Sequence, residues 1–131
     1  MKIGYIGLGK MGLPMATNMR AAGHELIVHN RSQPKVEAFV ADGGVAANSP
    51  AEVAAQADVI CVNVPTPEIS LEILLGTDGA VENARDGQLW IDFGTNGPDT
   101  ARTCADAGSS KGVGYLDAPV SGGPGGAEAG T

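Results

Sequence analysis

Three glycines near the N-terminus have the spacing of a phosphate-binding turn, Gly7-x-Gly9-x-x-Gly12. The apolar run 3–6 directly before them predicts a buried strand, and residues 11–22 carry methionine and alanine at helical spacing. A strand, a glycine turn and a helix in this order form a fingerprint that binds the pyrophosphate of a dinucleotide. The helix N-terminus adds free N–H groups and a partial positive charge. A glycine turn without a ligand is the alternative, and the apolar strand before the turn argues against it.

Each glycine of this turn has a separate task. Gly7 permits the tight turn, Gly9 lets the backbone approach a pyrophosphate, and Gly12 allows close packing of the helix on the strand. We therefore expect the cofactor to lie against the residues of this loop, which are Gly7, Leu8, Gly9, Lys10, Met11 and Gly12.

The end of the predicted second strand indicates which dinucleotide is bound. A carboxylate there accepts hydrogen bonds from the ribose 2′-OH of NAD, whereas an arginine accommodates the 2′-phosphate of NADP. Here the chain reads Asn30-Arg31-Ser32, and the first carboxylate is Glu37 in the next predicted helix. Arg31 can bind a phosphate with its planar fork, so the sequence favours NADP over NAD. Alternatively, Ser32 only caps the following helix and Arg31 is solvated; we expect Ser32 to act as a cap in either case.

Apolar runs alternate with helical segments along the rest of the chain. We predict strands at 26–29, 45–46, 59–64, 88–92 and 114–118, and helices at 34–41, 50–56, 68–75 and 98–107. Short strands that alternate with helices form right-handed βαβ units and a parallel sheet. The predicted fold is an α/β domain with a doubly wound, Rossmann-like parallel sheet of about six strands in the order 3-2-1-4-5-6.

Composition restricts the partners of the chain. Its 131 residues, 43% of them hydrophobic, suit one globular domain. The net charge of −7 argues against nucleic acid and against an anionic membrane surface. No apolar run approaches the ~20 residues of a membrane span, and a first strand that begins at Lys2 argues against a signal peptide. Cys61 and Cys104 have no metal-ligand spacing, so we expect buried thiols, no metal site and a cytoplasmic protein.

Two long motifs resemble the β-hydroxyacid dehydrogenase family. The first is GLGKMGLPMATNM at 7–19, and it continues in Gly23-His24 and Asn30-Arg31. The second is DAPVSGGPGGAEAGT at 117–131, which resembles the substrate-binding signature of the family. The resemblance covers essentially the whole chain, which corresponds to the N-terminal half of a family member. It implies an NADP-dependent oxidoreductase that interconverts a small 3-hydroxy acid and its semialdehyde or keto acid by hydride transfer.

The resemblance also implies roles for single residues. Asn30 with Arg31 would hold the 2′-phosphate, and the segment Val64-Pro65 would lie along the ribose on the nicotinamide side. Thr95 would contact the cofactor, although a Gly-Thr pair after a strand is also ordinary turn chemistry. The substrate carboxylate and hydroxyl would be bound by Ser121, Gly122 and Gly123.

The Ser121 motif has independent physical support. A serine and two glycines at the carboxyl end of a strand place bare backbone N–H groups where ligands bind in open α/β sheets. Such a nest suits a carboxylate, so we expect a small carboxylate-bearing substrate. A glycine-rich linker is the alternative, and the match to the family signature disfavours it.

The general acid/base of the family has no counterpart in this chain. The resemblance implies a lysine in a Lys-x-x-x-Asn pattern on a second, helical domain, which would also form a homo-oligomer. None of the four lysines stands in that pattern: Lys2, Lys10, Lys35 and Lys111. We therefore expect residues 1–131 to be part of a two-domain enzyme, able to bind nucleotide and inactive alone. His24 and His29 lie in a predicted turn and strand, and we expect structural roles for both.

Two other functions stay open at this point. An imine reductase would have similar cofactor residues, but its substrates lack the carboxylate that the Ser121 motif suits. A non-catalytic nucleotide-binding module would keep this domain without the lysine. Asn96 and the segment Asn63-x-Pro65-x-Pro67 are more polar or richer in proline than the family pattern, and they leave the identity of the substrate open.

Overall fold

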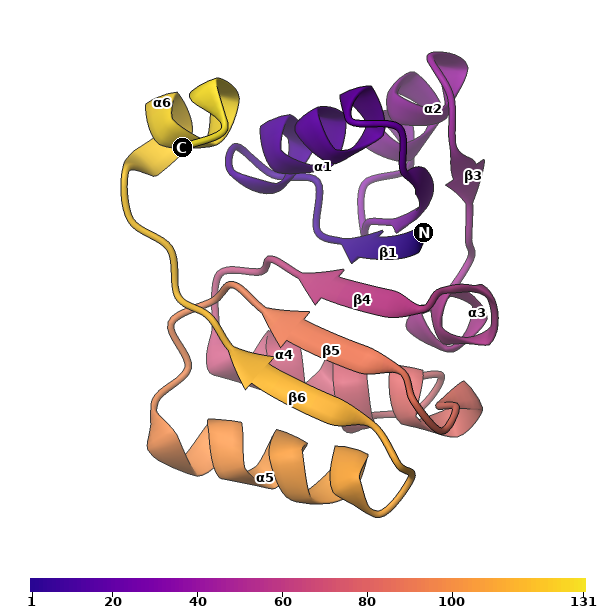
Figure 1. Ribbon diagram of the computed structural model, residues 1–131, viewed down its shortest axis with the longest axis vertical. Coiled ribbons are helices and arrows are strands. Elements are labelled where there is room, and N and C mark those ends of the chain that lie inside the picture. The colour runs from indigo at the N-terminus through magenta and orange to yellow at the C-terminus, as the bar shows by residue number, and fades with distance from the viewer.

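A computed structural model describes all residues, Met1–Thr131. Its strands are β1 (Lys2–Ile6), β2 (Glu25–His29), β3 (Val45–Ala46), β4 (Val59–Val62), β5 (Leu89–Asp92) and β6 (Gly114–Asp117). Its helices are α1 (Gly12–Ala21), α2 (Gln33–Ala41), α3 (Pro50–Gln56), α4 (Pro67–Leu75), α5 (Pro98–Ser109) and α6 (Gly123–Ala129), with a 3₁₀ turn η1 at Ala80–Asn83. The strands form one parallel sheet in the order β3-β2-β1-β4-β5-β6 (Figure 1), which confirms the predicted fold class and strand order.

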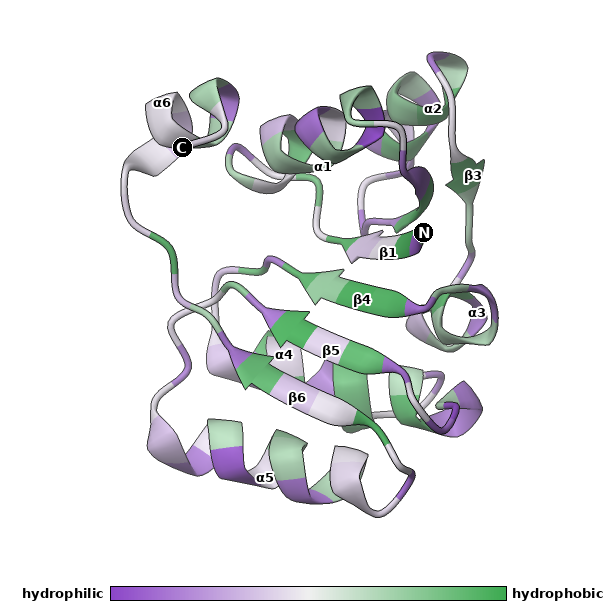
Figure 2. Ribbon diagram, in the orientation of Figure 1, coloured by the Kyte–Doolittle hydropathy of each residue, from purple (hydrophilic) through white to green (hydrophobic).

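Each face of the sheet has its own apolar core. Ile3 and Tyr5 of β1 pack in one cluster with residues of α1 and α2. Ile6, on the other face, packs in a second cluster with residues of α3, α4 and α5 and with Trp90 of β5. Because helices cover both faces, a strand such as β4 is apolar along its whole length, as Figure 2 shows.

The strand register aligns the ends that carry the predicted site. Ile6, the last residue of β1, pairs with His29 of β2 and with Val62 of β4, and Val62 pairs with Asp92 of β5. Four strands therefore end level at one edge of the sheet. The loops that follow them hold the glycine turn and the predicted cofactor residues, as in other open α/β sheets.

Two features of the backbone differ from the predictions. The strand predicted over 59–64 ends at Val62, so Val64 lies in the following loop. The glycine-rich segment 123–129 forms α6, although its composition is poor in helix formers. Tertiary contacts stabilise this helix against α1, where the side-chain amide of Asn18 donates to the carbonyl of Ala127 at 2.8 Å.

The predicted helix cap at Ser32 is wrong. Ser32 stands at the N-cap position of α2, but its side chain makes no capping hydrogen bond. A cap oxygen accepts from the N–H of the second or third helical residue. The second residue here, Pro34, has no N–H, and Ser32 makes no hydrogen bond to the third, Lys35; its ψ is 110°, against 161° and 153° at the capping residues Ser49 and Thr66. In α3 and α4 the proline is the first residue, and Ser49 and Thr66 cap these helices through the N–H of the third.

Both cysteines are buried and free, as predicted. Burial raises the pKa of the Cys61 thiol to about 12 and that of the Cys104 thiol to about 11, where the nearby Asp92 carboxylate adds to the rise. None of the helices combines the length and the apolar character that crossing a membrane requires.

We expect both thiols to react with a disulfide reagent at pH 8 only as fast as the domain unfolds, because the thiolate is the reactive form. An unfolded thiol has a pKa of about 8.5. In the folded domain the thiol pKa values are about 12 for Cys61 and about 11 for Cys104. Above about pH 9 the thiols of the unfolded chain are deprotonated while those of the folded domain are still protonated. The free energy of unfolding therefore falls as the pH rises through this range. Urea unfolding at pH 8 and pH 10 measures this loss, and Cys61→Ala should reduce it. Rapid labelling of the native protein would contradict the prediction.

Candidate functional site

Short backbone contacts hold the glycine turn between β1 and α1. Gly7 has a φ of 104°, and its N–H donates to the carbonyl of His29 at 3.1 Å. A β-carbon at Gly12 would lie 1.9 Å from the carbonyl oxygen of Gly7, so the helix packs directly on the turn. The first turn of α1 has no acidic residue that would offset its partial positive charge. This turn has the geometry and the field that the sequence predicts for an anion site.

Gly9 has open space around it. No atom of the protein lies within 4 Å of a β-carbon built at this position. Gly9 helps to line two cavities, one that also contains Arg31 and one between the glycine loop, α1 and α6. A ligand can therefore approach the backbone at Gly9 closely, as the pyrophosphate of a dinucleotide requires.

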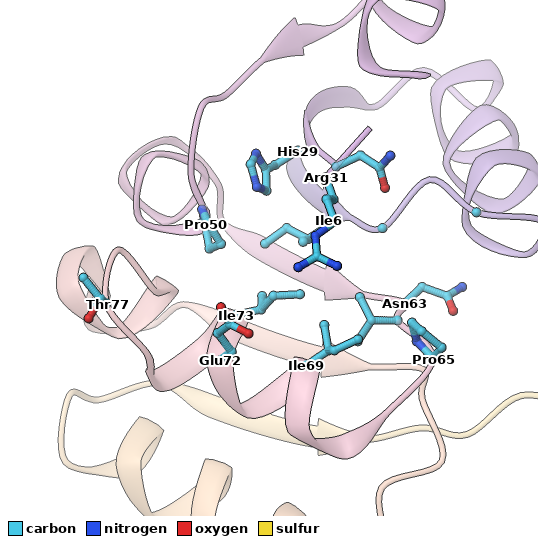
Figure 3. Close-up of a pocket in the computed structure, with 14 residues that line it drawn as sticks. Ile6, His29, Arg31, Pro50, Asn63, Pro65, Ile69, Glu72, Ile73 and Thr77 are labelled. Carbon is cyan, nitrogen blue, oxygen red and sulfur yellow. The ribbon is translucent and has the colours of Figure 1, made fainter. Parts of the chain in front are cut away.

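A cavity of about 440 Å³, which we call the Arg31 cavity, lies at the carboxyl ends of β1, β2 and β4. Arg31 enters it from the loop after β2, and Ile69 and Ile73 of α4 line the side opposite Arg31 (Figure 3). Its size suits a large part of a dinucleotide. The predicted cofactor residues on its lining are Gly7, Gly9, Asn30, Arg31, Val64 and Pro65.

The side chain of Asn30 is bonded within the protein. Its Oδ1 accepts from the N–H of Leu8 at 2.9 Å, and its Nδ2 donates to the carbonyl of Ser32 at 3.2 Å. The amide therefore ties the glycine turn to the loop that carries Arg31. This positioning role is not apparent from the sequence, in which Asn30 reads as a phosphate ligand.

The two histidines lie at opposite ends of β2. His29 ends β2 and borders the Arg31 cavity, with its Nδ1 3.0 Å from the carbonyl oxygen of Ala47. His24 directly precedes β2, at the amino end of the sheet, away from the strand ends that form the site. His29 therefore has one contact of a structural kind, with Ala47, and also lines the Arg31 cavity.

The loop after β5 adjoins a buried polar cluster. Asp92 is fully buried, and its Oδ1 accepts from the N–H of Gly94 at 2.9 Å. Its Oδ2, the side-chain nitrogen of Asn96 and the hydroxyl of Tyr115 are buried without a hydrogen-bond partner in the protein. Burial raises the pKa of Tyr115, and the negative charge of Asp92 adds to the rise, so the phenol stays protonated. Thr95, between Gly94 and Asn96, is exposed.

Ser121 lies at a second, smaller cavity. This cavity of about 210 Å³ lies between α1 and α6, and Ser121 and Val120 border it together with Met11 and Met15. The structure thus brings Ser121 to the same cavity as Met11 of the glycine loop. It does not bring Ser121, Gly122 or Gly123 to the lining of the Arg31 cavity, and Ser32 and Thr95 are also outside that lining.

The fold and the site define a class of protein. A doubly wound parallel sheet with a glycine turn and a cavity at the carboxyl ends of its strands is a dinucleotide-binding domain. The family model of the NAD binding domain of 6-phosphogluconate dehydrogenase matches residues 2–131, and the chain belongs to this family. The chain is therefore a pyridine-nucleotide-binding domain, as the sequence motifs predict.

Individual relatives agree with this assignment. A probable mitochondrial 3-hydroxyisobutyrate dehydrogenase of Dictyostelium discoideum is 43% identical over 129 residues, which are 98% of this chain and 40% of that protein. The 3-hydroxyisobutyrate dehydrogenase of Mycobacterium tuberculosis, solved with L-serine, has a TM-score of 0.90 and 36% identity, covering 99% of this chain and 44% of that one. An imine reductase of Myxococcus stipitatus, solved with NADP+, has a TM-score of 0.85 and 25% identity, covering 95% of this chain and 42% of that one. The chain spans less than half the length of these relatives.

Proposed function

We propose that this chain is the NADP-binding domain of an oxidoreductase that interconverts a small 3-hydroxy acid and its semialdehyde or keto acid. The higher identity to hydroxyacid dehydrogenases favours this reaction over imine reduction. In the proposed reaction the nicotinamide of NADP supplies or accepts the hydride. The residues of this chain bind and orient the two reactants.

One observation carries the choice of NADP. Arg31 follows β2 and lines the cavity next to the glycine turn, while the first carboxylate after β2 is Glu37, within α2. A ribose 2′-phosphate at this place would meet a guanidinium that can bind it with two hydrogen bonds. Ser32, whose hydroxyl caps no helix and is exposed, is available as a second donor.

The substrate would bind on the other side of the glycine loop. We assign its carboxylate to Ser121 and to the N–H groups of Gly122 and Gly123, which have φ values of 107° and 61°. We place Val64, Pro65 and the exposed Thr95 against the nicotinamide half of the cofactor, because all three follow strand ends at the same edge of the sheet.

Proton transfer would need a group outside these residues. None of the four lysines lines the Arg31 cavity or the cavity at Ser121. We propose that a lysine of a second, helical domain acts as the general acid/base, and that this domain forms the homo-oligomer. Residues 1–131 alone should therefore bind NADP and show no turnover.

A titration with NADPH and NADH in parallel, followed by nucleotide fluorescence, tests the cofactor assignment. NADPH should bind more tightly, and Arg31→Ala should weaken its binding about 10- to 100-fold, because a hydrogen-bonded charge pair contributes about 1.5–3 kcal/mol. NADH binding should weaken at least about 5-fold less than NADPH binding, since NADH has no 2′-phosphate for the arginine to bind.

Arg102→Ala is the matched control for Arg31→Ala. Arg102 is an exposed arginine of α5, its nearest carboxylate is Asp99 at 3.8 Å, and it does not line the Arg31 cavity. Its removal changes the net charge equally and should leave both affinities unchanged. Equal or tighter binding of NADH by the unmodified domain would contradict the assignment of NADP.

A further inference from the structure

One face of α4 completes the wall of the Arg31 cavity opposite the arginine. Ile69 and Ile73 are four residues apart, so they lie on the same side of the helix, and both are half-buried. Glu72 lines the same cavity and is exposed to solvent. Figure 3 shows Arg31 and Glu72 on opposite sides of the cavity, and no ion pair joins them within 4.0 Å. Glu72 is thus an unpaired carboxylate at a cavity that the glycine turn also borders.

The two sides of this cavity suit a flat aromatic ring. The isoleucines offer an apolar surface, and the planar guanidinium of Arg31 can stack on the opposite face of a ring. The glycine turn places the pyrophosphate at one end of the cavity, so the adenosine half of a dinucleotide falls between β2 and α4. A base in this position presents an edge to Glu72.

The chemistry of a carboxylate restricts which edge it can accept. An ionised glutamate has only acceptor oxygens. Adenine carries an exocyclic amine, which is a donor. A 6-oxo purine such as hypoxanthine carries a carbonyl acceptor at the same position and its N–H donor on the neighbouring ring nitrogen. A carboxylate placed at the exocyclic group therefore pairs with adenine and repels the carbonyl of the 6-oxo purine.

We propose that Glu72 accepts a hydrogen bond from the exocyclic amine of the adenine ring and selects adenine dinucleotides over 6-oxo purine dinucleotides. The inference rests on the proposed binding of NADP and extends it to the recognition of the base. Arg31 would then serve two parts of the cofactor, the 2′-phosphate through its N–H groups and the base through its planar face.

The test compares NADPH with its deamino analogue, reduced nicotinamide hypoxanthine dinucleotide phosphate, in the same fluorescence titration. The unmodified domain should bind NADPH at least about 10-fold more tightly than the analogue. Glu72→Gln should bring the two affinities within about 3-fold, because an amide can accept from the amine or donate to the carbonyl. The readout is the ratio of the affinity for NADPH to the affinity for the analogue. Glu72→Gln removes a negative charge near the phosphates and so raises both affinities, whereas the ratio depends only on the base.

Glu68→Gln is the matched control, since Glu68 is an exposed glutamate of the first turn of α4 that does not line the cavity. This variant should keep the ratio of the unmodified domain. Equal affinities of the unmodified domain for the two nucleotides would overturn the role of Glu72. Equal effects of Glu68→Gln and Glu72→Gln on the ratio of the affinities would do the same. Both outcomes would leave the proposed function intact. A preference for NADH that Glu72→Gln removes would instead assign the carboxylate to the ribose hydroxyl, and it would overturn both the inference and the choice of NADP. No binding of either nucleotide would overturn the proposed function and this inference together.

Discussion

Alanine at Gly9 should abolish NADPH binding and leave the domain folded. The protein leaves open space around this position, so the added methyl group meets no protein atom within 4 Å. In the complex the same methyl group would occupy the place where the backbone approaches the pyrophosphate. We expect the affinity for NADPH to fall at least about 100-fold, equivalent to about 2.7 kcal/mol, with a melting temperature within a few degrees of the unmodified domain.

Alanine at Gly7 or Gly12 should instead destabilise the fold. A β-carbon at Gly7 would lie 2.1 Å from the carbonyl oxygen of Asn63 and would stand on a backbone with a φ of 104°. At Gly12 it would lie 1.9 Å from the carbonyl oxygen of Gly7. Neither backbone oxygen can move without disturbing the start of the fold, so each substitution should cost at least about 3 kcal/mol. That is a large share of the about 5–15 kcal/mol that stabilises a typical domain.

Thermal unfolding and the NADPH titration, measured on each variant, separate the two effects. Gly125→Ala is the control, because a β-carbon at Gly125 also meets nothing within 4 Å, and this glycine lies in α6, outside the loop. It should keep both the melting temperature and the affinity. A Gly9→Ala domain that binds NADPH as tightly as the unmodified domain would show that the cofactor does not approach the backbone there.

The parts of the site that the sequence predicts are those that depend on local backbone chemistry. The glycine spacing and the strand before it are adjacent in the chain, and the arginine follows the next strand directly, so each is a local pattern. The strand order follows from alternating elements and right-handed crossovers, which leave few topologies. The predicted strand order and family are confirmed.

The parts that could not be predicted depend on distant residues. Residues 68–75 read correctly as helical, but the helix is apolar on most sides, so its sequence does not indicate that Ile69, Glu72 and Ile73 face the strand ends. The helix α6 depends on Asn18, whose amide reaches across from α1 to the carbonyl of Ala127. The missing cap at Ser32 goes with the backbone angle of that residue, whose ψ is 110°, whereas the capping residues Ser49 and Thr66 have ψ values of 161° and 153°.

Replacement of Gln88 by leucine should lower the free energy of unfolding by about 2–4 kcal/mol. Gln88, directly before β5, is 4% exposed, and its side-chain nitrogen donates to the carbonyls of Ala54 and Ala57 at 2.9 Å each. Its oxygen accepts from the indole N–H of Trp90 at 3.2 Å. Leucine would fill the space and leave Trp90 and Ala54 without partners, whereas Ala57 would keep its hydrogen bond from Arg85.

Urea unfolding followed by the fluorescence of Trp90, the single tryptophan, measures this loss. Gln56→Leu is the control, because the amide of Gln56 is half-buried and donates only to the carbonyl of Glu52 within the same helix, at 3.3 Å. Its replacement should cost less than about 1 kcal/mol. Equal losses for the two variants would show that the buried amide contributes no more than an ordinary side-chain hydrogen bond.

The variant Gln88→Glu keeps the shape of the side chain and changes its hydrogen bonds, so its stability shows the contribution of the hydrogen bonds alone. An ionised carboxylate would face two carbonyl oxygens and donate to neither, so Gln88→Glu should be at least as unstable as Gln88→Leu at pH 7. Burial raises the pKa of a carboxyl group, so its protonation as the pH falls towards 5 restores one donor and should narrow the difference from the unmodified domain. A difference that does not change with pH would contradict the hydrogen-bond explanation.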